Sequence, residues 1–325
     1  MPSLRSPDSA CQPRHCGGFR ADECTTPASR GRFALLAALL GLALAANAAD
    51  GMAQDSDAAR LRAQYEASAE RLRTSTFGRP LVLESQEKGD LLSGEIYARV
   101  DHRVEDLAGA LNDPRQWCGF LLLHPNISHC EAGGDAAAPV LGLDVTRQIG
   151  DTKAHRLAFT LQRTPPEPGY YGVDLAAASG PMGTSDYHIR VEAIAIDADS
   201  MFLHLSYSNR AGWSTRLALK AWLATLARDC VGFTVVGTSR RGEPEYIRGM
   251  RGSAERNVMR YFLAIEAYLG VRGAPADERF ERSLVAWLDS IGHYPRQLQD
   301  EDIPPYLEIK RRLHVPQPVS NVAAR

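Results

Sequence analysis

The sequence predicts an α+β fold, in which an antiparallel sheet packs one face against a long helix near the C-terminus, with further helices at both ends. Several segments alternate apolar and polar residues, which is typical of half-buried strands. Residues 251–270 instead follow the 3.6-residue period of an amphipathic helix. Because an antiparallel sheet with one apolar face must bury that face, we expect this helix to cover it.

The strands are predicted from alternation and from the turn residues between the segments. The segments expected to form strands are residues 94–101, 140–149, 155–163, 187–196, 201–209 and 230–237. The stretch 163–186 is rich in proline, glycine and small residues, and we interpret it as a loop. A loop of this length in a compact domain usually covers or gates something.

Helical periodicity recurs outside the long helix. It is found at residues 55–75, 102–112, 117–123, 213–228 and from 277 onward. Asp113-Pro114 ends the second of these helices, because proline cannot continue a helix. The predicted organisation is a leader with signal peptide at 1–48, a helical extension at 49–89, a central domain at 90–270 and a helical tail at 271–325.

The N-terminal region contains the pattern of a secretory signal peptide. Arg30 and Arg32 precede an apolar run at 33–46, and the small-residue pattern Ala46-Asn47-Ala48 follows. The apolar run is shorter than the roughly 20 residues of a membrane-spanning helix. We therefore expect cleavage after Ala48 and a periplasmic or secreted protein; the alternative is an uncleaved N-terminal membrane anchor.

Three cysteines lie beyond this leader, and an exported chain would sit in an oxidising compartment in which disulfides persist. Cys118 and Cys130 lie 12 residues apart and are expected to form a disulfide, which the chain-entropy relation values at about 3 kcal/mol. Cys230, in an apolar run, is predicted to be a buried, inert thiol. His124 and His129 beside Cys130 could be metal ligands, but no fourth ligand has suitable spacing, so no metal is predicted.

The net charge of −2 gives the chain no electrostatic footprint for nucleic acid. The sequence contains no G-x-S-x-G, P-loop, G-x-G-x-x-G or H-E-x-x-H motif. No cofactor is therefore predicted, and no reaction follows from the motifs.

The long helix carries residues of three kinds. Its apolar stripe contains Ala254, Val258, Tyr261, Phe262, Ile265 and Leu269. Glu255 and Asn257 flank this stripe. Glu255 either helps to start the helix, beside Ser253 as the N-cap, through the positive helix end or an ion pair with Arg248 or Arg251, or it lines with Asn257 the rim of a cavity beneath the helix. Arg256 and Arg260 lie opposite and are expected to be solvated.

The order of these elements resembles the helix-grip fold of the START and Bet v 1-like superfamily. The resemblance rests on GEIYARVDHRVEDLAGALNDPRQWC (94–118), VGFTVVG (231–237) and GMRGSAERNVMRYFLAIEAYL (249–269), and it covers about residues 90–270. The helix at 213–228 departs from the pattern, because members usually have a hairpin there. Members bind lipids, sterols and other hydrophobic molecules, and some catalyse cyclisation or hydrolysis, so the fold alone chooses no function.

The leading hypothesis is an exported protein that binds a hydrophobic or amphipathic small molecule between sheet and helix. Its expected walls are Tyr261, Phe262 and Ile265, with Glu255 and Asn257 at the polar end. The alternatives are a cyclase or hydrolase on the same fold, and a structural or interaction protein with a filled core.

Two further surfaces are interpreted from the sequence. Arg256 and Arg260 would contact anionic lipid headgroups if the helix face that carries them is exposed. His155, His188 and His204 are expected at the surface, and the last two would face inward if a further element covers the outer side of the sheet.

Overall fold

The computed structural model describes residues 56–135, 138–147, 149–225, 227–300 and 302–314. The predicted signal peptide and its cleavage site lie outside these residues. Within them, no helix combines the length and apolar character that crossing a membrane requires.

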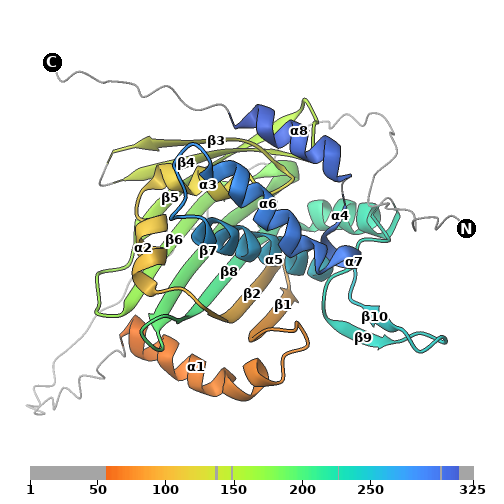
Figure 1. Cartoon of the computed structure of the whole chain (residues 1–325). Coiled ribbons are helices and arrows are strands. Elements are labelled where there is room, and N and C mark those ends of the chain that lie inside the picture. Colours follow the sequence, from red (N-terminus) through yellow and green to blue (C-terminus); the bar gives the residue numbers. More distant parts are fainter. Residues whose placement is uncertain (1–55, 136–137, 148, 226, 301, 315–325) are drawn as a thin grey trace, which may run out of the picture.

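The centre of the molecule is one antiparallel sheet of eight strands in the order β1-β2-β8-β7-β6-β5-β4-β3 (Figure 1). The strands are β1 (Leu81–Lys88), β2 (Leu91–Val100), β3 (Ile127–Gly134), β4 (Pro139–Thr146), β5 (Ala154–Arg163), β6 (Tyr170–Ser179), β7 (Thr184–Ala195) and β8 (Met201–Ala211). Strands β3 to β8 follow one another in the sheet, and β1 and β2 form a hairpin. Because β2 pairs with β8, this hairpin extends the sheet beside its last strand.

Eight α-helices surround this sheet in the described residues. They are α1 (Asp57–Arg73), α2 (Val104–Leu111), α3 (Pro114–Leu121), α4 (Trp213–Thr225), α5 (Gly249–Gly270), α6 (Arg279–Gly292), α7 (Pro295–Leu298) and α8 (Ile303–Leu313). A short 3₁₀ turn, Pro181–Gly183, precedes β7. Between α4 and α5, β9 (Val235–Thr238) and β10 (Pro244–Tyr246) form a separate two-stranded ribbon.

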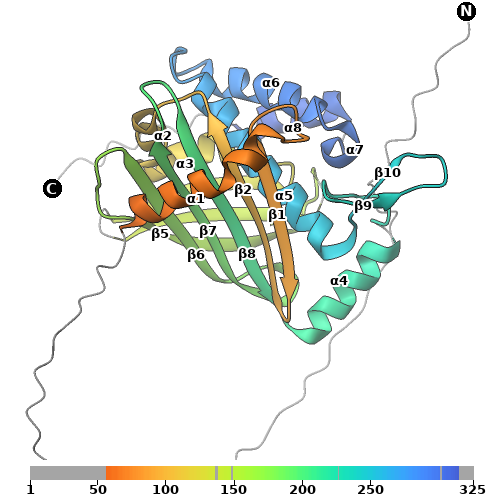
Figure 2. The same ribbon diagram turned by 90° about the horizontal axis from the view of Figure 1, so that it is seen from below.

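The elements form layers on both sides of the sheet. Helix α5 crosses one face and α1 crosses the other, while α6, α7 and α8 lie beyond α5 (Figures 1 and 2). Helix α5 approaches β2 very closely at Gly94, where an added Cβ would lie 3.0 Å from the carbonyl oxygen of Ala254. A larger residue at position 94 would therefore push the helix off the sheet.

The predicted fold class is confirmed, because the antiparallel sheet does grip a long C-terminal helix. The prediction of an unpaired loop at 163–186 is wrong, since β6 lies within this segment and pairs with both β5 and β7. The strand predicted at 230–237 does not join the main sheet. The sheet also begins before residue 90, because β1 pairs with β2 along its whole length.

Helix α5 starts earlier than predicted. It begins at Gly249, and its N-cap position is Arg248, which makes no side-chain capping hydrogen bond. Ser253 therefore lies inside the helix and is not its N-cap. This shift places Glu255 in the second turn, where it faces other elements of the molecule.

Candidate functional site

Glu255 is fully buried and holds an irregular segment against the start of α5. Its carboxylate accepts hydrogen bonds from the backbone amides of Phe233 (2.6 Å) and Thr234 (2.9 Å). It also accepts from the hydroxyls of Thr234 (2.7 Å) and Ser85 (2.6 Å). An added Cβ at Gly232 would lie 2.5 Å from this carboxylate, so the close approach requires glycine there. Glu255 thus fastens residues 232–234 and does not border the interior space.

Arg256 and Arg260 are buried, which contradicts the predicted exposed basic pair. Both guanidinium groups form ion pairs with Asp300, in the segment between α7 and α8. The tail helices cover this side of α5, and the indole nitrogen of Trp287 donates to the carbonyl of Arg260 (3.4 Å). The expected membrane contact through these two arginines is therefore wrong.

Asn257 and Tyr261 face the interior, where they join a small group of polar side chains. The Asn257 side chain interacts with His124 and Tyr207. The ring of Tyr261 stacks on His124 with centroids 4.9 Å apart. Burial, together with the nearby charges of Arg260 and Lys310, holds the pKa of His124 well below its usual value. His124 is therefore neutral at physiological pH.

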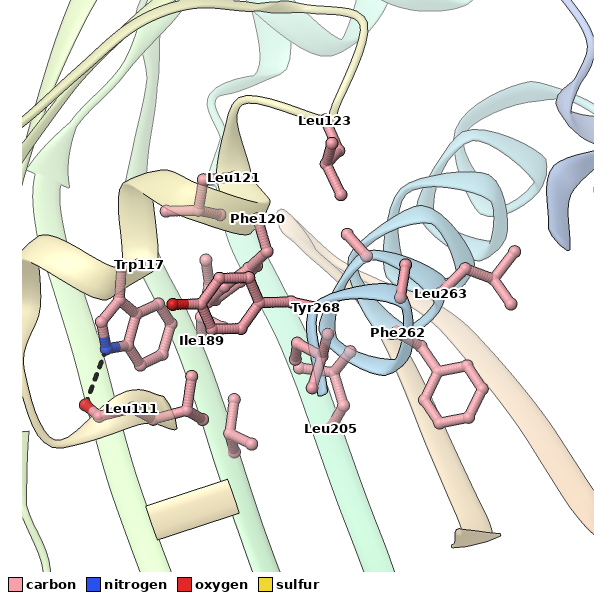
Figure 3. Close-up of a cluster of buried hydrophobic side chains, with 14 of the residues drawn as sticks. Leu111, Trp117, Phe120, Leu121, Leu123, Ile189, Leu205, Phe262, Leu263 and Tyr268 are labelled. Carbon is pink, nitrogen blue, oxygen red and sulfur yellow. Dashed lines mark hydrogen bonds between the residues drawn. The ribbon is translucent and has the colours of Figure 1, made fainter. Parts of the chain in front are cut away.

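The space between the sheet and α5 is filled by side chains. The empty volume that remains there, among the described residues, is about 10 Å³. A cavity needs roughly 10–15 Å³ to hold one water molecule. It is lined by Trp117, Phe120, Leu121, Leu143, Phe159, Leu175, Ile189, Val191, Leu205, Tyr261 and Ile265. Figure 3 shows Trp117, Phe120 and Tyr268 packed together beside α5.

Phe262, one of the predicted cavity walls, is fully buried in the same core. The guanidinium of Arg79 lies 5.2 Å from the centroid of its ring, and Arg79 also donates to Glu266 (2.8 Å). The predicted ligand cavity under the helix is thus closed in this structure, and its expected wall residues are core residues.

A larger hollow of about 440 Å³ lies on the outside of this core, where α3, β3, α5, α6 and the end of α8 meet. We call it the α3–α6 groove. Its lining is Arg115, Gln116, Cys118, Gly119, Leu122, His129, Cys130, Glu131, Ala132, Tyr268, Ala276, Arg279, Phe280, Leu313 and His314. Its volume is within the range of small-molecule sites, about 300–1,000 Å³.

The predicted disulfide forms one side of the α3–α6 groove. Cys118 on α3 and Cys130 on β3 are joined with an S–S distance of 1.99 Å and Cα atoms 5.4 Å apart. Cys230, predicted to be buried, is half-buried at the end of the segment that follows α4. No group of three or more His, Cys, Asp or Glu side chains in the described ranges is arranged to hold a metal ion.

The α3–α6 groove combines apolar walls with a cationic edge. Leu122 and Phe280 are buried against it, and the ring of His314 stacks on Phe280 at 3.8 Å. The hydroxyl of Tyr268 donates to Gln116 (3.2 Å). Arg279 donates to the backbone carbonyl of Ala274 (2.9 Å), and no carboxylate among the described residues lies within ion-pair distance of it.

The opposite face of the sheet carries a buried charge network beneath α1. His204 on β8 lies between Glu192 (2.7 Å) and Glu95 (3.0 Å), and its ring stacks on Tyr97 at 4.4 Å. Arg60 on α1 completes the network with a 2.6 Å ion pair to Glu192. His204 is therefore buried, as expected for the case in which another element covers this face, whereas His155 and His188 are exposed.

This network predicts a stability optimum between acid and alkaline pH. Burial lowers the pKa of His204, but the hydrogen bonds with Glu192 and Glu95 outweigh it and raise the pKa overall. Burial likewise raises the pKa of Glu192, and hydrogen bonds from His204 and Arg60 outweigh it, giving about 2. The contribution of His204 to folding stability is complete when the pH is below the ordinary histidine pKa near 6.5, and it is lost as the pH rises through the raised pKa of His204. The contribution of Glu192 is complete above its ordinary value and is lost as pH falls toward 2.

We therefore expect His204→Gln to remove about 1.5–3 kcal/mol of stability at pH 6, because a hydrogen bond to a charged group is worth that much. The difference from wild type should shrink as pH rises above the raised pKa of His204. Urea unfolding at several pH values measures it, and His188→Gln, at an exposed histidine, is the matched control. A difference that stays constant from pH 6 to pH 9 would contradict the assignment.

The strand order around the central helix makes this a helix-grip protein. No family model matches the chain, and no curated protein matches it. Among solved structures, it is similar to a STAR-related lipid transfer protein from Xanthomonas axonopodis (11% identity, 58% of this chain, 93% of that chain, TM-score 0.38). It is also similar to the Bet v 1-like protein Ara h 8.0201 (13% identity, 56% of this chain, 99% of that chain, TM-score 0.35). A third similar structure is norcoclaurine synthase from Thalictrum flavum (14% identity, 45% of this chain, 82% of that chain, TM-score 0.29). The fold assignment rests on the observed topology.

Proposed function

We propose that this protein is exported and binds an anionic, amphipathic small molecule, such as a fatty-acyl carboxylate, in the α3–α6 groove. The observation that carries the proposal is the contrast between the two spaces: about 440 Å³ in the groove against about 10 Å³ under α5. The proposed ligand site is therefore the groove on the outside of this core, in place of the cavity that the sequence predicts under α5.

The chemistry of the ligand is inferred from the lining. Leu122, Phe280 and the disulfide offer apolar contact to a hydrocarbon chain, and burial of such a chain is favourable by about 0.8 kcal/mol per CH₂. Arg279 offers guanidinium donors to a carboxylate, and hydrogen bonds between ionised groups are about twice as strong as neutral ones. Export is supported by the basic flank and apolar run at the N-terminus and by the Cys118–Cys130 disulfide, since disulfides persist in oxidising compartments.

The structure supports the alternative, a cyclase or hydrolase on this fold, less well than it supports ligand binding. His204 is the histidine paired with two carboxylates, but α1 covers it. His124 is neutral and packed on Tyr261 in the closed interior. Neither side chain lines the α3–α6 groove, which can accept a ligand without rearrangement.

Calorimetric titration with dodecanoate tests the proposal, with dodecanol and acetate as probes of the chain and the head separately. Arg279→Gln is expected to weaken dodecanoate binding about tenfold or more and to leave dodecanol binding unchanged. Ala276→Trp, which adds an indole at the exposed edge of the groove, should abolish binding of both.

The matched control is Val285→Trp, which adds the same indole at an exposed position on α6 outside the groove lining. It should bind dodecanoate as wild type does. Absence of dodecanoate binding to the wild-type protein, or equal binding by wild type and Ala276→Trp, would contradict the proposed site. Native mass spectrometry of protein purified from its own periplasm would identify the molecule that is carried.

A further inference from the structure

The segment 212–248, which joins β8 to α5, carries unusually exposed apolar side chains. Trp213 is 79% exposed and Leu217 64%, both on α4, while Val235 and Val236 on β9 are 56% and 60% exposed. Four of the seven most exposed large apolar residues of the described chain therefore lie in this one segment. Figures 1 and 2 show α4 and the β9–β10 ribbon at the same end of the molecule, beyond the start of α5.

Helix α4 has two apolar sides, of which the core uses one. Leu219 and Leu223 pack against a small buried cluster that includes Leu92 and Met250. Steps of 100° per residue place a second stripe on the opposite side. That stripe consists of Trp213, Leu217, Ala221 and Ala224, all exposed. Because α4 is already anchored through its inner side, the outer stripe is not explained by packing within the chain.

The same segment is basic, although the whole chain is weakly acidic. Residues 212–248 contain six Lys and Arg and three Asp and Glu, a net charge of +3, against −2 for the chain. Arg240 and Arg241 are exposed at the turn of the ribbon, and no ion pair to either is found in the part of the chain that the structure describes. Lys220 borders the apolar stripe of α4, where it pairs with Glu87 (2.8 Å).

We propose that this segment is a docking surface for a bilayer that contains anionic lipids. An amphipathic helix with an exposed tryptophan and basic flanks has the composition of helices that lie in the membrane interface, where tryptophan is enriched. The arginines at the ribbon turn would meet the lipid headgroups, each contributing about a fivefold gain in binding to an anionic surface. The inference is independent of the α3–α6 groove, which is built from other elements.

Vesicle co-sedimentation tests this surface, with phosphatidylcholine vesicles that contain or lack phosphatidylglycerol. The wild-type protein is expected to bind the anionic vesicles and to bind the neutral ones at least tenfold more weakly. Trp213→Ser/Leu217→Ser should lower binding to anionic vesicles at least tenfold, because it removes the inserted side chains. Arg240→Ser/Arg241→Ser should lower it about 25-fold, and added salt should weaken wild-type binding.

The matched control is Val285→Ser/Ile303→Ser, which removes two exposed apolar residues on α6 and α8 and should leave vesicle binding unchanged. Ala276→Trp should also bind vesicles normally, so failure of the groove and failure of the docking surface are distinguishable. Equal sedimentation of wild type with and without anionic lipid would overturn the proposal. So would concentration-dependent dimerisation, lost in Trp213→Ser/Leu217→Ser and without vesicle binding, because it would assign the surface to a second copy.

Discussion

Phe262→Ala is expected to lower the free energy of unfolding by about 3–5 kcal/mol, the usual cost of removing a buried phenylalanine ring. Phe262 has no exposed surface, and the space beside it under α5 is filled. The truncation would also remove the ring that the Arg79 guanidinium covers, leaving the Arg79–Glu266 pair above a void. A pre-existing ligand cavity would have made the same change milder, so the size of the loss reports directly on the closed interior.

Equilibrium urea unfolding of the disulfide-intact protein measures this loss, since a shift in midpoint with unchanged slope reports stability. Phe262→Leu is the matched variant, because it keeps an apolar side chain of similar reach and should cost under about 1.5 kcal/mol. Stability loss below about 1 kcal/mol for Phe262→Ala would show that α5 rests on open or collapsible space. In that case the interior would again become the candidate ligand site.

The strands that could be predicted are those whose two faces differ in chemistry. β2, β7 and β8 alternate clearly, because one face packs on α5 and the other on α1 or solvent. The alternation of apolar and polar residues is weaker in β1, β3 and β6. β1 and β3 are edge strands with polar or glycine-rich halves, and β6 follows a proline-rich stretch and is rich in alanine. Small residues carry little hydrophobic contrast, so the sequence of β6 does not distinguish a paired strand from a loop.

The α3–α6 groove could not be predicted, because its lining comes from five separate elements. Leu122, Tyr268 and Phe280 each look like ordinary apolar positions of their own segments. The disulfide between Cys118 and Cys130 was the one local signal, and it does mark one wall of the groove. The burial of Arg256 and Arg260 could not be predicted either. It depends on Asp300, which lies about 40 residues further along the chain and which the tail places over α5.

The sequence placed Glu255 on a flank of the apolar stripe but gave no sign of its partners. Those partners, residues 85 and 233–234, are distant in the chain and meet only where the segment before β9 crosses the start of α5. The carboxylate thereby joins the central domain to the segment that carries the proposed docking surface. The segment also packs Phe233 into the main core and Leu219 and Leu223 against a smaller cluster, and the carboxylate adds to these contacts.

Glu255→Ala is accordingly expected to cost about 3–5 kcal/mol. The change would leave the amides of Phe233 and Thr234 without their acceptor, and each unsatisfied buried donor costs about 1–3 kcal/mol. The hydroxyls of Thr234 and Ser85 lose an acceptor as well, although they can rotate toward other groups. Urea unfolding gives the global loss, and hydrogen exchange at the two amides should show the segment opening first. Glu245→Ala, at an exposed glutamate of β10, is the control and should change stability by under about 0.5 kcal/mol. Unchanged protection of the two amides in Glu255→Ala would mean that Gly232 and its neighbours are held on α5 by packing alone, and that the carboxylate is not the fastening.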